Sequence, residues 1–223
     1  MKLYAVLLAA GLFAASLLGR ADAAIVFTEV GDAGNMIGTA ADTGATLTNT
    51  SGSLQINGAI SLEPSAGPDY VDMYKFMFAP ATGTDKFTVF TGSAFDPWLI
   101  ADPVLYLFDW EGKGIAMDDE SGGSGQARMS LFLATGTYYI AIAFAGVEPL
   151  DGDGNPIFDT FGNQSVLSLL ALDSWLEEPF ANEPGIVGAY GITAQVPVPG
   201  TLALALAGIF AAWSTRGRQR RVA

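Results

Sequence analysis

The chain has 223 residues, of which 50% are hydrophobic, and it contains neither cysteine nor histidine. These absences exclude disulfides and thiol catalysis and remove the commonest general base, so we expect no enzymatic activity; a hydrolase built on two carboxylates is the remaining enzymatic alternative. Residues 24–195 carry four basic against 22 acidic side chains, a net charge of −18 that repels nucleic acid and attracts divalent cations. The sequence therefore predicts one acidic domain that does not bind nucleic acid.

Residues 1–23 have the pattern of a secretory signal peptide. Lys2 supplies the positive charge, and the segment 3–18 is almost entirely apolar. Ala21 and Ala23 place small residues where a signal peptidase reads them, so we expect cleavage after Ala23 and export of the chain. An uncleaved membrane anchor is the alternative.

Six segments between the two termini predict β-strands, because bulky and β-branched residues are concentrated there and turn residues separate them. The segments are 70–78, 86–91, 103–108, 128–133, 136–144 and 189–194. The stretch 31–52 is rich in glycine, threonine and alanine, which indicates a loop with at most one edge strand. Short strands without intervening helices predict an all-β, antiparallel sandwich.

The order of motifs along this region is specific. Asp69-Tyr-x-Asp-x-Tyr-x-Phe is followed by Asp102-Pro-x-Leu-x-Leu-Phe-Asp, then by Asp118-Asp-Glu-Ser-Gly-Gly and by Gly136-Thr-Tyr-Tyr-Ile. This order resembles the bacterial pre-peptidase C-terminal (PPC) domain. The resemblance implies a jelly-roll-like sandwich that acts as an accessory module, with a core over about 54–146 and a last strand over about 188–195. The segment 147–187 departs from the pattern as an insertion.

The first candidate cation site is the acidic turn that contains Asp118, Asp119 and Glu120. Crowded carboxylate oxygens are the ligands that calcium prefers. The alternative is a solvated turn in which an aspartate accepts hydrogen bonds from its own backbone.

The second candidate site is Asp151-Gly-Asp153-Gly-Asn155, with Asp159 four residues further on. Oxygen-bearing side chains at alternate positions are typical of calcium loops. The segment fails as an EF-hand, because Pro156 stands at the glycine position and Gly162 at the position of the bidentate glutamate. A calcium loop of another kind and a plain turn both remain open.

The segment 165–178 shows apolar residues at the spacing of a short amphipathic helix, with a strand as the alternative. The tryptophans at 98, 110 and 175 have two readings as well. They are either core residues or exposed rings that stack on sugars.

Residues 196–221 have the pattern of a sorting or anchoring tail. Val196-Pro197-Val198-Pro199-Gly200 precedes an apolar run that ends at Trp213, and the basic cluster Arg216, Arg218, Arg220 and Arg221 follows. Counted from Val196 to Trp213, the segment has 18 residues, about the minimum for one membrane crossing, with the arginines on the cytoplasmic side. A plain C-terminal membrane anchor explains the same residues.

This tail resembles the PEP-CTERM sorting signal, although Val198 stands where the usual motif has glutamate. The resemblance implies transient anchoring in the inner membrane, recognition by an exosortase and delivery to the cell surface or the extracellular polymer. Together these patterns predict a structural or adhesive protein of the surface or polysaccharide matrix, with calcium as its expected ion. A secreted carbohydrate-binding module or, failing that, a two-carboxylate glycosidase is the alternative.

Overall fold

The computed structural model describes residues 24–49, 51–61, 69–81, 85–92, 100, 102–158, 164–165, 170–176 and 187–196. They all belong to one compact unit, Ala23–Pro197. The signal segment 1–23 and the tail from residue 197 onward lie outside the described residues. No helix long and apolar enough to cross a membrane occurs in the part of the chain that the structure describes.

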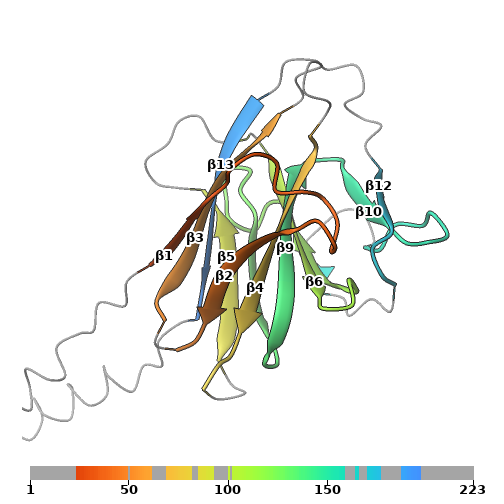
Figure 1. Ribbon diagram of the computed structural model, residues 1–223. Coiled ribbons are helices and arrows are strands. Elements are labelled where there is room, and N and C mark those ends of the chain that lie inside the picture. The colour runs from red at the N-terminus through yellow and green to blue at the C-terminus, as the bar shows by residue number, and fades with distance from the viewer. Residues whose placement is uncertain are drawn as a thin grey trace, which may run out of the picture. The chain divides into compact units, whose positions relative to one another are not determined.

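Two β-sheets pack against each other as a sandwich (Figure 1). The first sheet has five strands, in the order β1 (Ile25–Thr28), β3 (Ser53–Ser61), β13 (Val187–Gln195), β5 (Lys86–Thr91) and β8 (Arg128–Phe132). The second has six strands, in the order β11 (Gln164–Ser165), β7 (Gly114–Asp118), β6 (Pro103–Asp109), β9 (Gly136–Phe144), β4 (Val71–Phe78) and β2 (Ala41–Leu47). The all-β class and all six predicted strands are confirmed, the latter as β4, β5, β6, β8, β9 and β13.

The expectation of a purely antiparallel sandwich is wrong for two strand pairs. β1 runs parallel to β3, and β2 runs parallel to β4. The chain leaves β1, adds β2 to the edge of the six-stranded sheet and returns to the five-stranded sheet as β3. Parallel neighbours require such a crossover, and here it passes through the other sheet instead of through a helix.

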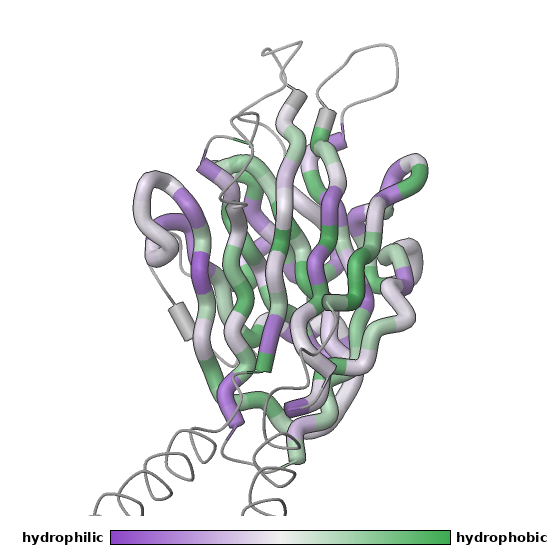
Figure 2. The backbone as a smooth tube through the Cα atoms, turned by 90° about the vertical axis from the view of Figure 1, so that its left-hand side faces the viewer, coloured by the Kyte–Doolittle hydropathy of each residue, from purple (hydrophilic) through white to green (hydrophobic). Residues whose placement is uncertain are grey.

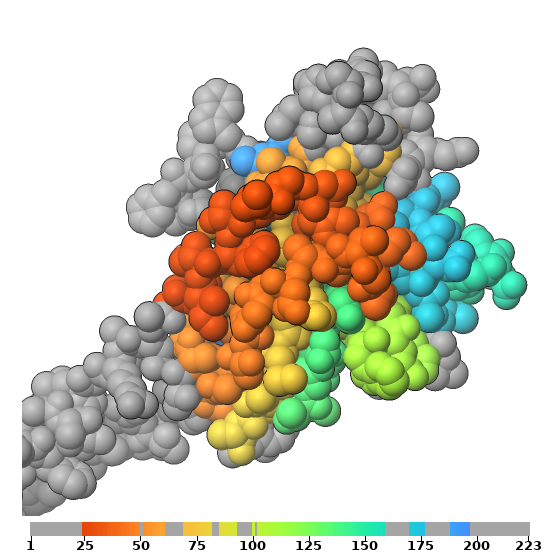
Figure 3. Space-filling model, in the orientation of Figure 1, coloured from red at the N-terminus to blue at the C-terminus, as the bar shows by residue number. Residues whose placement is uncertain are grey.

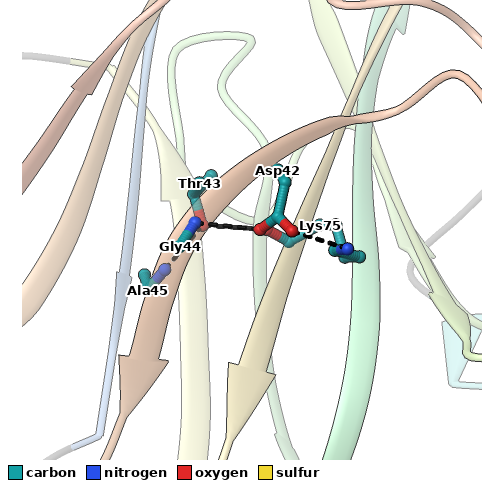
Figure 4. Close-up of polar contacts among 5 residues, drawn as sticks. All are labelled: Asp42, Thr43, Gly44, Ala45 and Lys75. Atoms are coloured by element: carbon teal, nitrogen blue, oxygen red, sulfur yellow. Dashed lines mark hydrogen bonds and ion pairs between the residues drawn. The ribbon is translucent and has the colours of Figure 1, made fainter.

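The parallel pair of β2 and β4 contains a register shift between Asp42 and Thr46. Asp42 forms an ion pair with Lys75, with 2.6 Å between its Oδ2 and the Lys75 Nζ, and its Oδ1 accepts a hydrogen bond from the Gly44 amide (Figure 4). The Thr43 hydroxyl donates to the Lys75 carbonyl at 2.8 Å. These local contacts satisfy the polar groups that the shifted ladder leaves without partners.

Aromatic side chains form the interior between the two sheets. Phe76 of β4 stacks on Phe87 of β5 with ring centroids 5.3 Å apart, and Tyr74 meets Tyr190 of β13 at 6.4 Å. Hydrophobic segments run along the strands of both sheets (Figure 2). On β9, every residue from 138 to 144 is buried, so both faces of the six-stranded sheet are covered.

The predicted insertion packs onto the six-stranded sheet. Tyr106 and Phe108 of β6 make edge contacts with Trp175, with ring centroids 5.5 and 6.2 Å apart. Trp175 lies in β12 (Ser174–Leu176), which pairs with β10 (Glu148–Leu150). The helix expected over 165–178 is wrong for residue 165, which ends β11, and for residues 170–176, where Trp175 covers the sheet from strand β12. Residues 166–169, 177 and 178 lie outside the described residues.

Candidate metal centre

The loop after β1 brings acidic side chains to the start of β4. The Glu29 carboxylate accepts hydrogen bonds from the amides of Ala33, at 3.0 Å, and Ala59, at 2.9 Å. Asp32 accepts one from the Gly34 amide at 2.6 Å, and the Gly34 carbonyl in turn accepts from Met73 of β4 at 2.8 Å. The loop is thus tied at one end to β3 and at the other to β4. Figure 3 shows the stretch from β1 to β2, in red to orange, lying over the neighbouring strands.

Asp72 is the second residue of β4 and is completely buried. Its side chain has the same parity as Tyr74, so it points into the sandwich towards β13. The Tyr190 hydroxyl donates to its Oδ2 at 2.6 Å, and the Tyr74 and Tyr190 hydroxyl oxygens lie 2.5 Å apart. The other carboxylate oxygen, Oδ1, is buried and has no hydrogen-bond partner.

Three carboxylates converge at this point. One oxygen from each of Asp32, Asp69 and Asp72 lies within 4.8 Å of the corresponding oxygens of the other two. Burial, followed in importance by the charge of Asp69, raises the pKa of Asp72 to about 8; the charges of Glu29 and Asp32 act in the same direction, against the hydrogen bond from Tyr190. Without a counter-ion, the centre therefore holds Asp72 in its protonated form at neutral pH.

This donor set fits a hard divalent cation. Calcium binds oxygens at about 2.3–2.6 Å, so two oxygens on the same ion stand at most about 5 Å apart, which matches the observed spacing. A cation would supply the partner that Asp72 Oδ1 lacks and offset the repulsion among the three carboxylates. Glu29 already accepts two backbone amides, so its part is to hold the loop and add negative charge.

The turn predicted as the first cation site is closed by its own aspartate. Asp118 is buried, and its Oδ1 accepts hydrogen bonds from the amides of Ser121, at 3.0 Å, and Arg128, at 2.7 Å. Asp119 and Glu120 line a separate cavity of about 280 Å³ together with Asp102 and Glu148. This geometry is that of the solvated-turn alternative, and calcium at this turn remains a prediction.

The second predicted site has a similar arrangement. Asp151 Oδ1 accepts hydrogen bonds from the amides of Asp153, at 3.0 Å, and Asn155, at 2.8 Å. These bonds, that from Asn155 first, hold the pKa of Asp151 below its usual value. Asp153 and Asn155 are exposed, and Asp159 lies outside the described residues. Among the described residues, only the group of Asp32, Asp69 and Asp72 brings three acidic side chains within the spacing of one ion.

The sequence patterns did not predict this centre, although two of its three aspartates belong to a motif described above. Asp69 and Asp72 stood in the motif that carried the family resemblance, and no metal was assigned to them. Asp32 lies within the stretch 31–52, which was predicted to be mainly loop, and Glu29 lies just before it. A usable signal was the parity of the strand, since Asp72 shares the inward side with three aromatic residues, Tyr74, Phe76 and Phe78. A carboxylate in such a row requires a buried partner.

The structure describes only some of the residues on which the predictions for the tail and the tryptophans rest. Val196, the first residue of the predicted sorting motif, is buried directly after β13 and belongs to the core. The rest of that motif, the arginine cluster, Ala21, Ala23 and Trp98 lie outside the described residues. Trp175 is a core residue whose Nε1 donates to the Asn35 carbonyl at 2.7 Å, whereas Trp110 is 66% exposed.

Comparisons with known proteins give a likeness in structure. No family model matches the chain, and no curated protein matches it. Among solved structures, the chain is similar to the pre-peptidase C-terminal domain of collagenase from Bacillus anthracis, with 12% sequence identity and a TM-score of 0.33. The match covers 68% of this chain and 92% of that domain. The likeness concerns the β-sandwich fold alone and says nothing about ligands or activity.

Proposed function

We propose that the chain is an exported, non-enzymatic protein of the cell surface or extracellular matrix whose β-sandwich binds a calcium ion through Asp32, Asp69 and Asp72. The observation that carries the calcium proposal is Asp72, a completely buried carboxylate with one oxygen unpaired and two further carboxylates beside it. A buried polar atom without a partner is costly, and a coordinated cation would satisfy the Asp72 oxygen and allow its carboxylate to ionise.

The ion would act as a structural link between distant parts of the chain. Asp32 belongs to the loop after β1, Asp69 precedes β4, and Asp72 contacts β13 through Tyr190. A ligand that binds only the folded state stabilises it by mass action, by about 1.4 kcal/mol at ten times the dissociation constant. Extracellular calcium modules typically bind at about 10⁻⁴–10⁻³ M, so millimolar calcium is the relevant range.

Export and surface delivery rest on the two terminal patterns. The signal-like segment 1–23 supports secretion, and the tail 196–221 supports sorting by an exosortase-type enzyme. An intact mass of the surface form that lacks the residues from Leu202 onward would support removal of the tail, and a mass that retains them would support the plain anchor. The absence of histidine and cysteine supports a role without catalysis.

Thermal unfolding of the full-length chain in detergent tests the calcium proposal. Millimolar calcium should raise the melting temperature by a few degrees over the same sample in chelator, given the size of the domain. Magnesium should raise it less, because magnesium gives up its water ligands reluctantly. Equal shifts with both ions would reduce the effect to charge screening and contradict a specific site.

A further inference from the structure

A second feature, unrelated to the acidic centre, is an open groove at the edge of the five-stranded sheet. It has a volume of about 720 Å³, which lies in the range of small-ligand sites, about 300–1,000 Å³. β8, the start of β9 and the turn after β6 line it, and its principal side chains are Lys86, Asp109, Trp110, Phe132, Thr135 and Tyr138.

Two aromatic rings of the groove are exposed to solvent. Trp110 is 66% exposed and Phe132 is 59% exposed, whereas the aromatic residues between the sheets are buried. Because both rings are exposed, packing in the hydrophobic core does not account for either of them. Exposed aromatic residues that lie together in a groove mark a binding surface.

The backbone and the inner wall of the groove are fixed by hydrogen bonds. Trp110 lies in a tight turn that Asp109 closes, because the Asp109 Oδ1 accepts the amides of Glu111 and Lys113 at 2.8 and 2.9 Å. Tyr138, on the inner wall, is buried and donates to the Ala134 carbonyl at 2.8 Å. The Lys86 ammonium lies 5.3 Å from the centroid of the Phe132 ring, on the neighbouring strand. A preformed site loses little conformational entropy when a ligand binds.

The charges and polar groups of the groove restrict the class of ligand. One cation, Lys86, and one anion, Asp109, leave the lining residues without net charge, while residues 24–195 as a whole carry −18. Anionic polymers are therefore repelled from the domain at long range. Three hydroxyl-bearing residues, Ser130, Thr135 and Thr137, line the same groove, and the Ser130 hydroxyl lies 3.1 Å from that of Thr88. A lining that combines aromatic and hydroxyl-bearing residues suits a sugar ring, which has a C–H face and hydroxyl edges.

We propose that this groove binds a neutral polysaccharide, with Trp110 and Phe132 stacking on sugar rings and Asp109 and the threonine hydroxyls accepting or donating hydrogen bonds at the ring edges. The proposal goes beyond calcium binding and does not depend on it. It gives an exported domain a direct attachment to uncharged matrix polymers.

Affinity electrophoresis of the full-length chain in detergent tests the proposal. The gels contain a soluble β-1,4-glucan, β-1,3-glucan, α-glucan or galactomannan, with alginate as the anionic comparison. At least one neutral polymer should retard the wild-type chain. Trp110→Ala should weaken that binding about tenfold or more, since loss of a stacking aromatic costs its burial and its ring contacts. Trp110→Phe should retain part of it.

Val30→Ala is the matched control, because Val30 is 94% exposed and lies outside the groove. It should bind as tightly as the wild type, and the melting temperatures of all variants should agree. Absence of retardation by every neutral polymer, or equal retardation of Trp110→Ala, would overturn the proposal. So would binding to alginate alone, or a concentration-dependent dimer that Trp110→Ala dissociates, since the groove would then bind a polyanion or a second copy of the chain.

Discussion

Aspartates serve two different purposes in this molecule, and the contrast distinguishes a turn from a candidate metal site. In the turn 151–155, the Asp151 carboxylate accepts amides two and four residues further along the chain, so its oxygen is satisfied locally. At the centre beside β4, the Asp32 carboxylate comes from the loop after β1 and lies close to those of Asp69 and Asp72 at the start of β4. One buried oxygen there has no partner. Asp151 is thus satisfied within its own turn, whereas the fold brings Asp32 next to Asp69 and Asp72 and leaves one oxygen that a cation could satisfy.

The largest expected effect concerns the pH dependence of the centre in chelator. The pKa of Asp72 is raised to about 8 in the folded state, against a usual value of 3.8, so between these values the folded chain keeps a proton that the unfolded chain has lost. The free energy of unfolding should therefore fall as pH rises from 4 to 8, by at most about 1.4 kcal/mol per pH unit.

Asp72→Asn isolates this contribution, because asparagine keeps the size and cannot ionise. Urea unfolding in chelator at pH 5, 6, 7 and 8 should show wild type losing stability relative to the variant as pH rises. Saturating calcium should abolish that relative loss, since the ion replaces the proton. Parallel pH profiles of the two chains in chelator would mean that Asp72 is not held protonated by burial.

A smaller effect is expected at the turn. Backbone amides hold the pKa of Asp151 below its usual value, so its carboxylate stabilises the fold above the unfolded pKa, and this contribution is lost as pH falls through the folded pKa. Asp151→Asn should lower the melting temperature slightly at pH 7 and leave it unchanged in acid. The decrement should be equal in calcium and in chelator. A decrement that grows in calcium would instead identify the turn as an ion site.

The sequence predicted the strands well but did not predict the candidate metal centre, and the reason is physical. Strands such as 136–144 carry their signal in consecutive residues, through aromatic and β-branched side chains bounded by turns. The parallel pairings of β1 with β3 and of β2 with β4 depend on where the chain crosses between sheets, which no local pattern encodes. The short strand at 174–176 looked helical because apolar spacing does not reveal that Trp175 lies over Tyr106 and Phe108.

The candidate site was even harder to predict, because its residues are distant in sequence and close only in the fold. Acidic residues close in sequence predicted cation sites at 118–120 and at 151–159. Only the second segment has the spacing of a calcium loop. The centre instead joins positions 32 and 72, which are 40 residues apart. Only the fold shows that Tyr190 and two further carboxylates surround Asp72. The composition favours a hard cation, because an acidic chain without histidine or cysteine offers oxygen ligands almost alone, and calcium remains a prediction.

Equilibrium dialysis against calcium tests the central claim most directly. The full-length chain is compared with Asp72→Asn and with Asp153→Asn, which changes an exposed aspartate of the rival turn. We predict one calcium ion per wild-type chain, none in Asp72→Asn at the same free calcium concentration, and one in Asp153→Asn. Calcium that remains bound to Asp72→Asn and is lost from Asp153→Asn would contradict the account and assign the ion to the turn.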